Sequence, residues 1–592
     1  MGMSKALLVG ALAALPGFSA AQDAVSYDLE TYGSGDSAGS PFQTFMSNRE
    51  VKPPEMQVNR NGSAGLAPGF VFIGVDGEPT SGQNWPTIWG MRLLNSHTAR
   101  QADWITDFSK ERQGTLIWTG NYTEPFDFRT QTYKGEPVLT FWSGQLMDGY
   151  GLGTYYILNQ SYAEIAHFSP VGYDGGDLHE FSITDNDTAL IIIYTPAPAN
   201  LSSVGGDENG WIYDGVFQEI DIETGELRFE WNASTHVPVN ETYNERGDAG
   251  SSEGSPWDYF HMNSVQKDHN GDFLVSARVM DCVYKISGVD GSIIWKFGGK
   301  ASDFDVADEA AFAYQHDARW LNEEQTRMTL FNNGPTSDTG HSRGFLLEVN
   351  YDNMTVQLLR EFHNEAQTFG QFEGSLQALD PSDENTNFFL GYGSEPFFAE
   401  FDSDGNLLLD VQFGATNVVN NYRAYKLAWQ GKPTTLPDIH FDNDENNAYF
   451  SWNGATDVEQ WVLYTANSTN GTWVQAAAVN RTGFETTFNL NDVSLDTYVR
   501  AKAVNADGDS LGWTQATDGN KLFDASGDVS DVTGRTPDSV TSTTSTTTQS
   551  TSPTSTTASE SSETSGVAVK VGQTIVEKVI IAAVVVGGAA LV

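Results

Sequence analysis

Three histidines of this chain recur at equivalent points of repeated segments, and together they could carry out acid–base or nucleophilic chemistry. Histidine is scarce, with 10 residues among 592. His179, His261 and His316 nevertheless each precede the same kind of strand pattern. An imidazole acts as acid, base or nucleophile near neutral pH. A single histidine of this sort would be read as a structural residue of its repeat, so the prediction depends on three of them occurring in phase.

Amide and guanidinium groups accompany these histidines. Asn263 follows His261 by two residues and lies on the same face of an extended strand. Arg278 closes the strand pattern that runs on from His261, and Arg319 follows His316 by three residues. In an otherwise anionic molecule these groups form a local cationic pocket, and a guanidinium fork matches the oxygens of sulfate or phosphate. We therefore predict a site for a tetrahedral oxyanion, with His316, His261 and His179 as catalytic candidates and Asn263, Arg278 and Arg319 as substrate-binding candidates.

Repeated β-hairpins must position these residues. One hairpin pattern covers 217–231 and a similar one covers 283–295, each with two alternating strands and a tight turn that contains Gly. A second kind of hairpin pattern lies between them, at 183–194 and 265–277. Two hairpins make one four-stranded blade, so the repeats predict a β-propeller.

The repeat spacing predicts six blades. His261, His316 and Gly374 are separated by 55 and then 58 residues, slightly more than in common propeller repeats. Roughly 400 residues at this period, with allowance for insertions, give about six blades. The inner strands of neighbouring blades converge on the axis, so the histidines would meet at one end of the central channel, where propellers bind ligands.

The rest of the chain predicts an all-β ectodomain between two targeting signals. Residues 1–21 are typical of a secretory signal peptide, and 22–431 hold the propeller. Short strand patterns over 432–526 predict a small sandwich of immunoglobulin or fibronectin III type. The Ser/Thr-rich segment 527–566 is typical of a glycosylated stalk. Residues 567–592 fit a GPI-attachment propeptide, with a hydrophobic tail anchor as the alternative, because the apolar tail falls short of the roughly 20 residues of a spanning helix.

These signals predict a secreted protein at the cell surface, attached to the membrane through its C-terminal anchor and in contact with a cell wall. The composition excludes other partners. Acidic residues number 78 against 31 basic ones, and the net charge of −47 repels nucleic acid. Cys282 is the single cysteine of the sequence, so no intrachain disulfide and no cysteine-based metal site can form. We expect no metal and no cofactor.

Several motifs in order and spacing resemble the arylsulfate sulfotransferase (arylsulfotransferase) family, in particular its fungal secreted branch. The resemblance covers the propeller region, 61–429. The motifs that carry it are Trp257–Val265, Phe273–Arg278, Ile294–Gly299, Gln315–Arg319 and Leu330–Gly334. The resemblance implies a six-bladed β-propeller with the active site in its channel. It also implies transfer of a sulfuryl group from an aryl sulfate to a phenol without a nucleotide donor, and the sequence has no Gly-rich loop for a nucleotide phosphate.

The resemblance also implies roles for individual residues. His316 matches the histidine that becomes transiently sulfated. His261, Asn263 and Arg278 match the residues that hold and polarise the sulfate. His179 matches the histidine that deprotonates the acceptor or protonates the leaving phenol. The cations would stabilise charge on the transferring oxygens.

Two alternatives to a sulfotransferase remain open. The first is a non-catalytic propeller that binds a cell wall, which the sandwich, stalk and anchor favour. The second is a metal- or quinone-dependent propeller enzyme that uses the histidines as ligands. Donor-dependent labelling of His316 separates the transferase from the binding protein, whereas a tightly bound metal or chromophore would favour the last alternative.

Overall fold

Strands make up almost all of the regular structure of this protein. The computed structural model describes residues 41–61, 65–79, 81–91, 114–334 and 340–530. The predicted signal peptide, the C-terminal tail and nearly all of the stalk lie outside these residues. The described residues contain no α-helix, only short 3-10 turns, and hence no helix long and apolar enough to cross a membrane.

Six mainly antiparallel sheets follow one another along the first part of the chain. The first two have the strand orders β29 (Tyr425–Leu427), β2 (Phe70–Gly74), β4 (Pro86–Gly90), β5 (Thr115–Thr119), and β6 (Phe126–Tyr133), β7 (Glu136–Leu146), β8 (Gly151–Leu158), β9 (Glu164–Phe168). The next two are β10 (Phe181–Ile183), β11 (Thr188–Ala199), β12 (Gly210–Asp221), β13 (Leu227–Asn232), with β14 (Trp257–Asp258) on β12, and β15 (Met262–Lys267), β16 (Phe273–Ala277), β17 (Cys282–Ile286), β18 (Ile293–Gly298). The last two are β20 (His316–Trp320), β21 (Arg327–Asn332), β22 (Arg343–Asn350), β23 (Thr355–Phe362), β19 (Asp305–Val306), and β24 (Ser375–Ala378), β25 (Phe388–Gly391), β26 (Phe397–Phe401), β27 (Leu407–Gln412), β1 (Gln57–Asn61).

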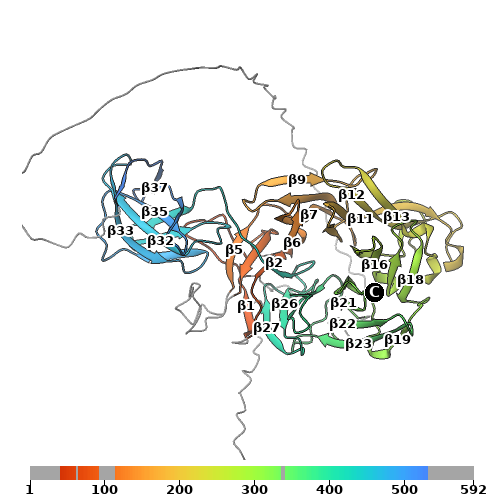
Figure 1. Ribbon diagram of the computed structural model, residues 1–592. Helices are drawn as coiled ribbons and strands as arrows, with labels where there is room; N and C mark the ends of the chain where they lie inside the picture. Colours follow the sequence, from red (N-terminus) through yellow and green to blue (C-terminus); the bar gives the residue numbers. More distant parts are fainter. Residues whose placement is uncertain (1–40, 62–64, 80, 92–113, 335–339, 531–592) are drawn as a thin grey trace, which may run out of the picture. The chain divides into compact units, whose positions relative to one another are not determined.

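Two of these sheets are completed by strands from distant parts of the sequence. β29 pairs antiparallel with β2, and β1 pairs antiparallel with β27. A further short pair joins β3 (Asp76–Gly77) to β28 (Val419–Asn420). The sheets therefore follow one another around a ring (Figure 1). The fold is an all-β propeller, as predicted; the count of six blades stays a prediction, which the succession of six sheets supports.

The hairpins predicted from the alternating patterns are confirmed. Residues 217–231 form the end of β12 and most of β13, with Phe217 opposite Trp231. Residues 283–295 form the corresponding hairpin of β17 and β18. β17 is buried along its whole length, whereas alternate residues of β18 reach solvent. The inner strands are buried because neighbouring sheets cover both of their faces.

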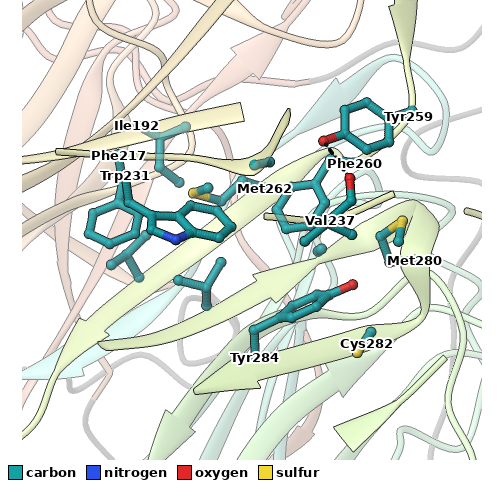
Figure 2. Packing of buried hydrophobic residues seen from close by; sticks show 14 of the residues in the cluster. Ile192, Phe217, Trp231, Val237, Tyr259, Phe260, Met262, Met280, Cys282 and Tyr284 are labelled. Carbon is teal, nitrogen blue, oxygen red and sulfur yellow. Dashed lines mark hydrogen bonds between the residues drawn. The ribbon is translucent and has the colours of Figure 1, made fainter. Parts of the chain in front are cut away.

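Aromatic and sulfur-containing side chains fill the space between two neighbouring sheets, those of β12 and β15. Phe217 and Trp231 pack there with Phe260, Met262 and Tyr284, all of them almost completely buried. Figure 2 shows this cluster, with Tyr259 donating a hydrogen bond to the carbonyl of Val237. This packing fixes the place where β15 begins, and His261 immediately precedes that strand.

Two further sheets follow the propeller. One has three strands, β30 (Asp438–Asp442), β31 (Asn447–Ser451) and β34 (Glu485–Asn489). The other contains β32 (Gln460–Ala466), β33 (Trp473–Asn480), β35 (Tyr498–Val504), β36 (Ser510–Trp513), β37 (Ala516–Thr517), β38 (Leu522–Phe523) and β39 (Val529–Ser530). The strands expected in this region are thus confirmed, while its assignment to the immunoglobulin or fibronectin III type stays a prediction. Asn453 exchanges two hydrogen bonds with the backbone of Thr119 in the propeller.

Candidate active site

The three predicted histidines lie at or just before the start of β10, β15 and β20, which belong to three successive sheets. His179 lies two residues before the first residue of β10, His261 immediately precedes β15, and His316 is the first residue of β20. The rings of His179 and His261 are 5.0 Å apart and nearly perpendicular. Both rings lie close enough to His316 for a positive charge on either to lower its pKa. All three side chains are buried, with 4 %, 9 % and 1 % of their surface exposed. The structure therefore brings the three imidazoles into one site.

Two of the imidazoles are oriented by aspartates. Nδ1 of His179 lies 2.6 Å from Oδ2 of Asp177, and Nδ1 of His261 lies 2.5 Å from Oδ2 of Asp258. A carboxylate accepts the Nδ1–H in each pair, so Nε2 is left for the site. Sequence analysis missed both aspartates, although they precede their histidines by only two and three residues.

An amide, rather than a carboxylate, orients His316. Nδ2 of Asn333 donates to the carbonyls of Gly370 and Glu373, which identifies Oδ1 as its acceptor atom. Oδ1 lies 2.8 Å from Nδ1 of His316 and accepts the proton of that nitrogen. Nε2 of His316 is therefore the unprotonated nitrogen, and it accepts a 3.2 Å hydrogen bond from the backbone N–H of Glu373. Glu373 holds this position with a φ of 66°, in the left-handed region.

Burial and neighbouring charges keep His316 neutral. Burial lowers its pKa well below the ordinary value, the nearby guanidinium of Arg278 lowers it further, and the hydrogen bond to Asn333 only partly opposes this. Burial also lowers the pKa of His261, although the carboxylate of Asp258 acts in the opposite direction. A neutral imidazole has a lone pair on Nε2, which is the form that a nucleophile or a general base requires.

Arg278 brings a positive charge to the site, and no carboxylate of the described residues contacts its guanidinium directly. Its guanidinium stacks over the ring of Tyr314 at 4.7 Å, and Nη2 donates a 3.3 Å hydrogen bond to the carbonyl of Gln371. Its Nε is buried and has no hydrogen-bond partner among the described residues. Burial lowers the pKa of this guanidinium, while the more distant Asp258 raises it. An anion at this place would supply the missing acceptor.

Asn263 lies at an irregularity of β15, where the pairing with β16 shifts by one residue. Its side chain is completely buried, and Nδ2 donates to the carbonyl of Gln315, the residue before His316. Oδ1 has no hydrogen-bond partner among the described residues. Asn263 therefore ties the start of β15 to the start of β20, which are the strands that position His261 and His316.

Arg319 lies in a different arrangement from the one predicted. Its Nη2 is 2.6 Å from Oε2 of Glu180, and its Nε is 2.8 Å from Oδ1 of Asp317. Nη1 donates to the carbonyl of Val265. These partners engage all three nitrogens of the guanidinium, so the structure places Arg319 in a buried ion network.

This ion network, which was not predicted, joins three arginines and three carboxylates. Its members are Arg129, Arg319, Arg423, Asp127, Glu180 and Asp317. Burial alone would raise the pKa of Glu180, but the three arginines lower it to about 2. Nη2 of Arg423 also donates to the carbonyls of His179 and Asn263, as does the hydroxyl of Tyr422. The network therefore supports the strands from which the histidines project.

A short sequence repeat underlies the network. Phe126–Arg129 and His316–Arg319 share the pattern x-Asp-x-Arg, and both begin the first strand of their sheet. Asp127 and Asp317 have φ values of 53° and 55°, and the strand pairing shifts at the same point in both segments. Each arginine binds the aspartate two residues before it. This repeat was the available sign that Arg319 is structural, because the copy at Arg129 has no histidine beside it.

Metal ligation is not apparent in the geometry of the site. Within the described parts of the chain, no group of three or more His, Cys, Asp or Glu side chains is arranged to hold a metal ion. Nδ1 of each of the three histidines is engaged by Asp177, Asp258 or Asn333. The arrangement instead presents the unprotonated Nε2 of His316 next to the guanidinium of Arg278, which suits covalent transfer of an anionic group.

Comparison of solved structures returns proteins with very low sequence identity. A protein of unknown function from Bacteroides caccae is 11 % identical, with a TM-score of 0.33, and the match covers 60 % of this chain and 98 % of that one. The β-propeller domain of Myceliophteria thermophila Cps50 (Swd1) is 9 % identical, with a TM-score of 0.26 and coverage of 56 % and 95 %. The Dos1 propeller is 12 % identical, with a TM-score of 0.25 and coverage of 81 % and 98 %. At these TM-scores the assignment of a propeller depends on the sheet topology described above.

Comparison of sequences gives a more specific result. No curated protein matches the chain. The family model described as Arylsulfotransferase (ASST) matches residues 129–414. This segment contains all three histidines, together with Asn263, Arg278 and Asn333. Residues 129–414 are therefore similar to the arylsulfotransferase (ASST) family.

Proposed function

We propose that this protein transfers a sulfuryl group from an aryl sulfate to a phenol through a sulfohistidine at His316, without a nucleotide donor. The observation that carries the proposal is the arrangement of three imidazoles. Asp177, Asp258 and Asn333 each hold one Nδ1. Arg278 lies beside the imidazoles, and in the part of the chain that the structure describes no carboxylate contacts it. The match to the arylsulfotransferase family supports the same class of reaction.

In the first half-reaction, the Nε2 lone pair of His316 attacks the sulfur of the donor. The N–S bond forms as the S–O bond to the phenol breaks, and the electron pair of that bond leaves with the phenolate oxygen. His179 or His261, protonated on Nε2, gives this proton to the phenolate. Arg278 stabilises the negative charge on the sulfuryl oxygens. The enzyme is left with a sulfuryl group on Nε2 of His316, while the proton stays on Nδ1 and is donated in a hydrogen bond to Oδ1 of Asn333.

In the second half-reaction, an acceptor phenol takes the place of the first one. The histidine that lost its proton accepts the hydroxyl proton as the phenol oxygen attacks the sulfur. The N–S bond breaks, and its electron pair returns to Nε2 of His316. Asp258 supports this histidine chemistry because its carboxylate opposes the lowering of the pKa of His261 by burial.

The backbone N–H of Glu373 has a defined part in this scheme. It donates to Nε2 of His316 in the free protein, so attack on sulfur requires this hydrogen bond to break. The released N–H then faces the transferring group and can donate to one of its oxygens, in the manner of an oxyanion hole. Asn333 holds the carbonyl of the same residue and keeps the backbone in place.

Intact mass spectrometry of the purified, deglycosylated protein tests the proposal. The protein is mixed with an aryl sulfate, with and without a phenol, and released phenol is followed in parallel. We expect a mass increase of one SO3 group on the wild type, its loss on addition of phenol, and no increase for His316→Ala. A folded wild type that neither gains mass nor releases phenol across a panel of aryl sulfates would contradict the proposal and favour a binding function.

We further propose that the protein is secreted and held at the cell surface by a GPI anchor. The signal-peptide pattern at 1–21 and the small residues that precede the apolar tail support this. Phosphatidylinositol-specific phospholipase C, applied to intact cells that express the full chain, should release the protein into the medium. Retention after this treatment, with extraction by detergent alone, would favour a hydrophobic tail anchor.

A further inference from the structure

Tyr314, two residues before His316, has an unusual backbone conformation. Its φ is 54°, in the left-handed region. A bulky aromatic residue is rarely found there, because its Cβ crowds the backbone. The N–H of Tyr314 donates a 2.8 Å hydrogen bond to Oδ1 of Asp281, which holds the backbone in this conformation. Residues in strained conformations of this kind cluster at functional sites, where the surrounding structure keeps them in place.

The side chain of Tyr314 supports the guanidinium of Arg278. Cζ of Arg278 lies over the face of the tyrosine ring, 4.7 Å from its centroid, which is a favourable distance for a cation–π contact. Nη2 of Arg278 also donates to the carbonyl of Gln371, but at 3.3 Å this hydrogen bond is long for a charged donor. The ring face of Tyr314 is therefore a main support of the guanidinium.

The guanidinium projects from a turn that the same segment of chain holds in place. The 3-10 turn Arg278–Met280 ends at Asp281, whose carboxylate accepts the backbone hydrogen bond described above. Gln315 follows Tyr314 directly and is completely buried. Its Nε2 lies 3.1 Å from the carbonyls of Ala277 and Cys282, which are on either side of the turn. Both the turn and its arginine thus depend on residues that immediately precede His316.

The carbonyl of Tyr314 contacts the imidazole of His316. It lies 3.1 Å from Nδ1, on which Oδ1 of Asn333 also lies at 2.8 Å. A carbonyl oxygen only accepts hydrogen bonds, so this contact too places the proton on Nδ1 and leaves Nε2 unprotonated. Tyr314 therefore contacts the guanidinium of Arg278 through its ring and the imidazole of His316 through its backbone.

From these contacts we infer that Tyr314 is a positioning residue, whose ring face keeps the guanidinium of Arg278 beside His316, where the sulfuryl group is transferred. The inference rests on the proposed function and adds a residue that acts through Arg278. A free arginine side chain has many rotamers, and ordering it costs entropy. A cation that is already held where negative charge develops raises the rate of transfer. Without the ring, the guanidinium would occupy other rotamers and stabilise the transferring oxygens for less of the time.

Single-turnover formation of the sulfated enzyme tests the role of the ring. Wild type, Tyr314→Phe and Tyr314→Leu are mixed with increasing concentrations of an aryl sulfate, and intact mass after quenching gives the second-order rate constant of adduct formation. Tyr314→Phe keeps the ring face and should stay within about threefold of the wild type, whereas Tyr314→Leu keeps apolar volume without a π face and should be about tenfold slower. The matched control is Phe523→Leu, which removes a half-buried ring beneath Lys521 in the C-terminal sheets and should leave the rate constant unchanged.

Combination with Arg278→Ala shows whether the ring acts through the guanidinium. In the Arg278→Ala protein the ring has lost its partner, so adding Tyr314→Leu should slow adduct formation by less than about twofold. A further tenfold loss there, or a Tyr314→Leu single variant as fast as the wild type, would overturn the inference and leave the sulfotransferase intact. A wild type that forms no sulfated enzyme would overturn the proposed function, and the inference with it. Tyr314→Met, a second variant without a ring, gives the same comparison if Tyr314→Leu does not fold.

Discussion

The histidine site and the ion network are adjacent in the propeller, yet their charges are satisfied in opposite ways. In the ion network every guanidinium contacts at least two carboxylates, and the three positive charges balance three negative ones. In the histidine site the guanidinium of Arg278 contacts an aromatic ring and a backbone carbonyl, and none of the described carboxylates is in contact with it. The lone pair of Nε2 on His316 is held only by one backbone N–H.

This difference separates residues that hold the site from residues that are open to a ligand. A buried arginine whose nitrogens are all bound to carboxylates and carbonyls contributes to structure, and removing one partner leaves other charges buried without compensation. A buried arginine that has no carboxylate in contact keeps a positive charge with which an anion from outside can pair. Substitutions in the two regions should therefore affect different measurements.

Replacing His316 should have the largest effect. His316→Ala removes the nucleophile, so we expect phenol release to fall by about 10^3-fold or more while the melting temperature changes little. Initial rates with a saturating aryl sulfate measure this. Activity within tenfold of the wild type would show that the sulfuryl group is carried elsewhere.

Replacing Arg319, a member of the ion network, should lower the stability of the fold. Arg319→Ala leaves Glu180 and Asp317 with fewer counter-charges, and we expect a loss of about 3–5 kcal/mol in the free energy of unfolding. Chemical denaturation of the purified protein measures this loss. The control is Arg228→Ala at the exposed pair with Asp221, which should barely move the unfolding midpoint. A stable Arg319→Ala protein with weakened donor binding would restore the original assignment of Arg319 to the substrate.

Replacing Arg278 should lower activity and leave the stability of the fold nearly unchanged. Arg278→Ala removes a cation from the transferring oxygens, so kcat/KM for the donor should fall by about 10^2-fold with little change in unfolding free energy. Arg278→Lys keeps the charge and should recover part of the rate. Equal losses of stability in the Arg278→Ala and Arg319→Ala proteins would remove the distinction between the two regions.

Replacing Asn333, which binds Nδ1 of His316, should produce the smallest effect, a shift in the pH dependence of adduct formation. In the wild type the lowered pKa of His316 keeps Nε2 unprotonated well below pH 6.5, so the acid limb of adduct formation lies below that value. Asn333→Asp places a carboxylate on Nδ1 and raises the pKa, so the acid limb should move upward by about one pH unit or more. Single-turnover adduct formation from pH 4 to 8 measures this. If the acid limb of adduct formation lies at the same pH in Asn333→Asp as in the wild type, Asn333 does not control the protonation of His316.

Local patterns in the sequence were sufficient to predict much of the fold. Alternation around a tight turn predicted the hairpin at 217–231, and the phase of the repeats predicted that His179, His261 and His316 would meet. Asp177 and Asp258 could have been found in the same way, because they lie two and three residues before their histidines. Such features depend only on neighbours along the chain.

Other features depend on contacts between distant segments and were not predictable from local patterns. Glu180 and Arg319 are 139 residues apart, and their pairing follows from the way that two sheets face one another. Asn333 immediately follows β21, the strand that pairs with β20 through His316 and Phe331, and its side chain contacts His316. Residue type alone does not reveal which guanidinium finds a carboxylate, so Arg278 and Arg319 looked equivalent in the sequence.

The closing strand of the ring has a consequence for the order of folding. Tyr422 and Arg423, just before β29, hold the carbonyls of His179 and Asn263, which lie 244 and 160 residues earlier than Arg423 in the chain. A growing polypeptide cannot make these bonds until nearly the whole propeller has been synthesised, and contacts of such long range form slowly. We therefore expect the catalytic end of the channel to be assembled last, after the individual hairpins have formed. A chain released before Tyr422 would carry every histidine of the site and still lack the residues that hold two of the three strands together.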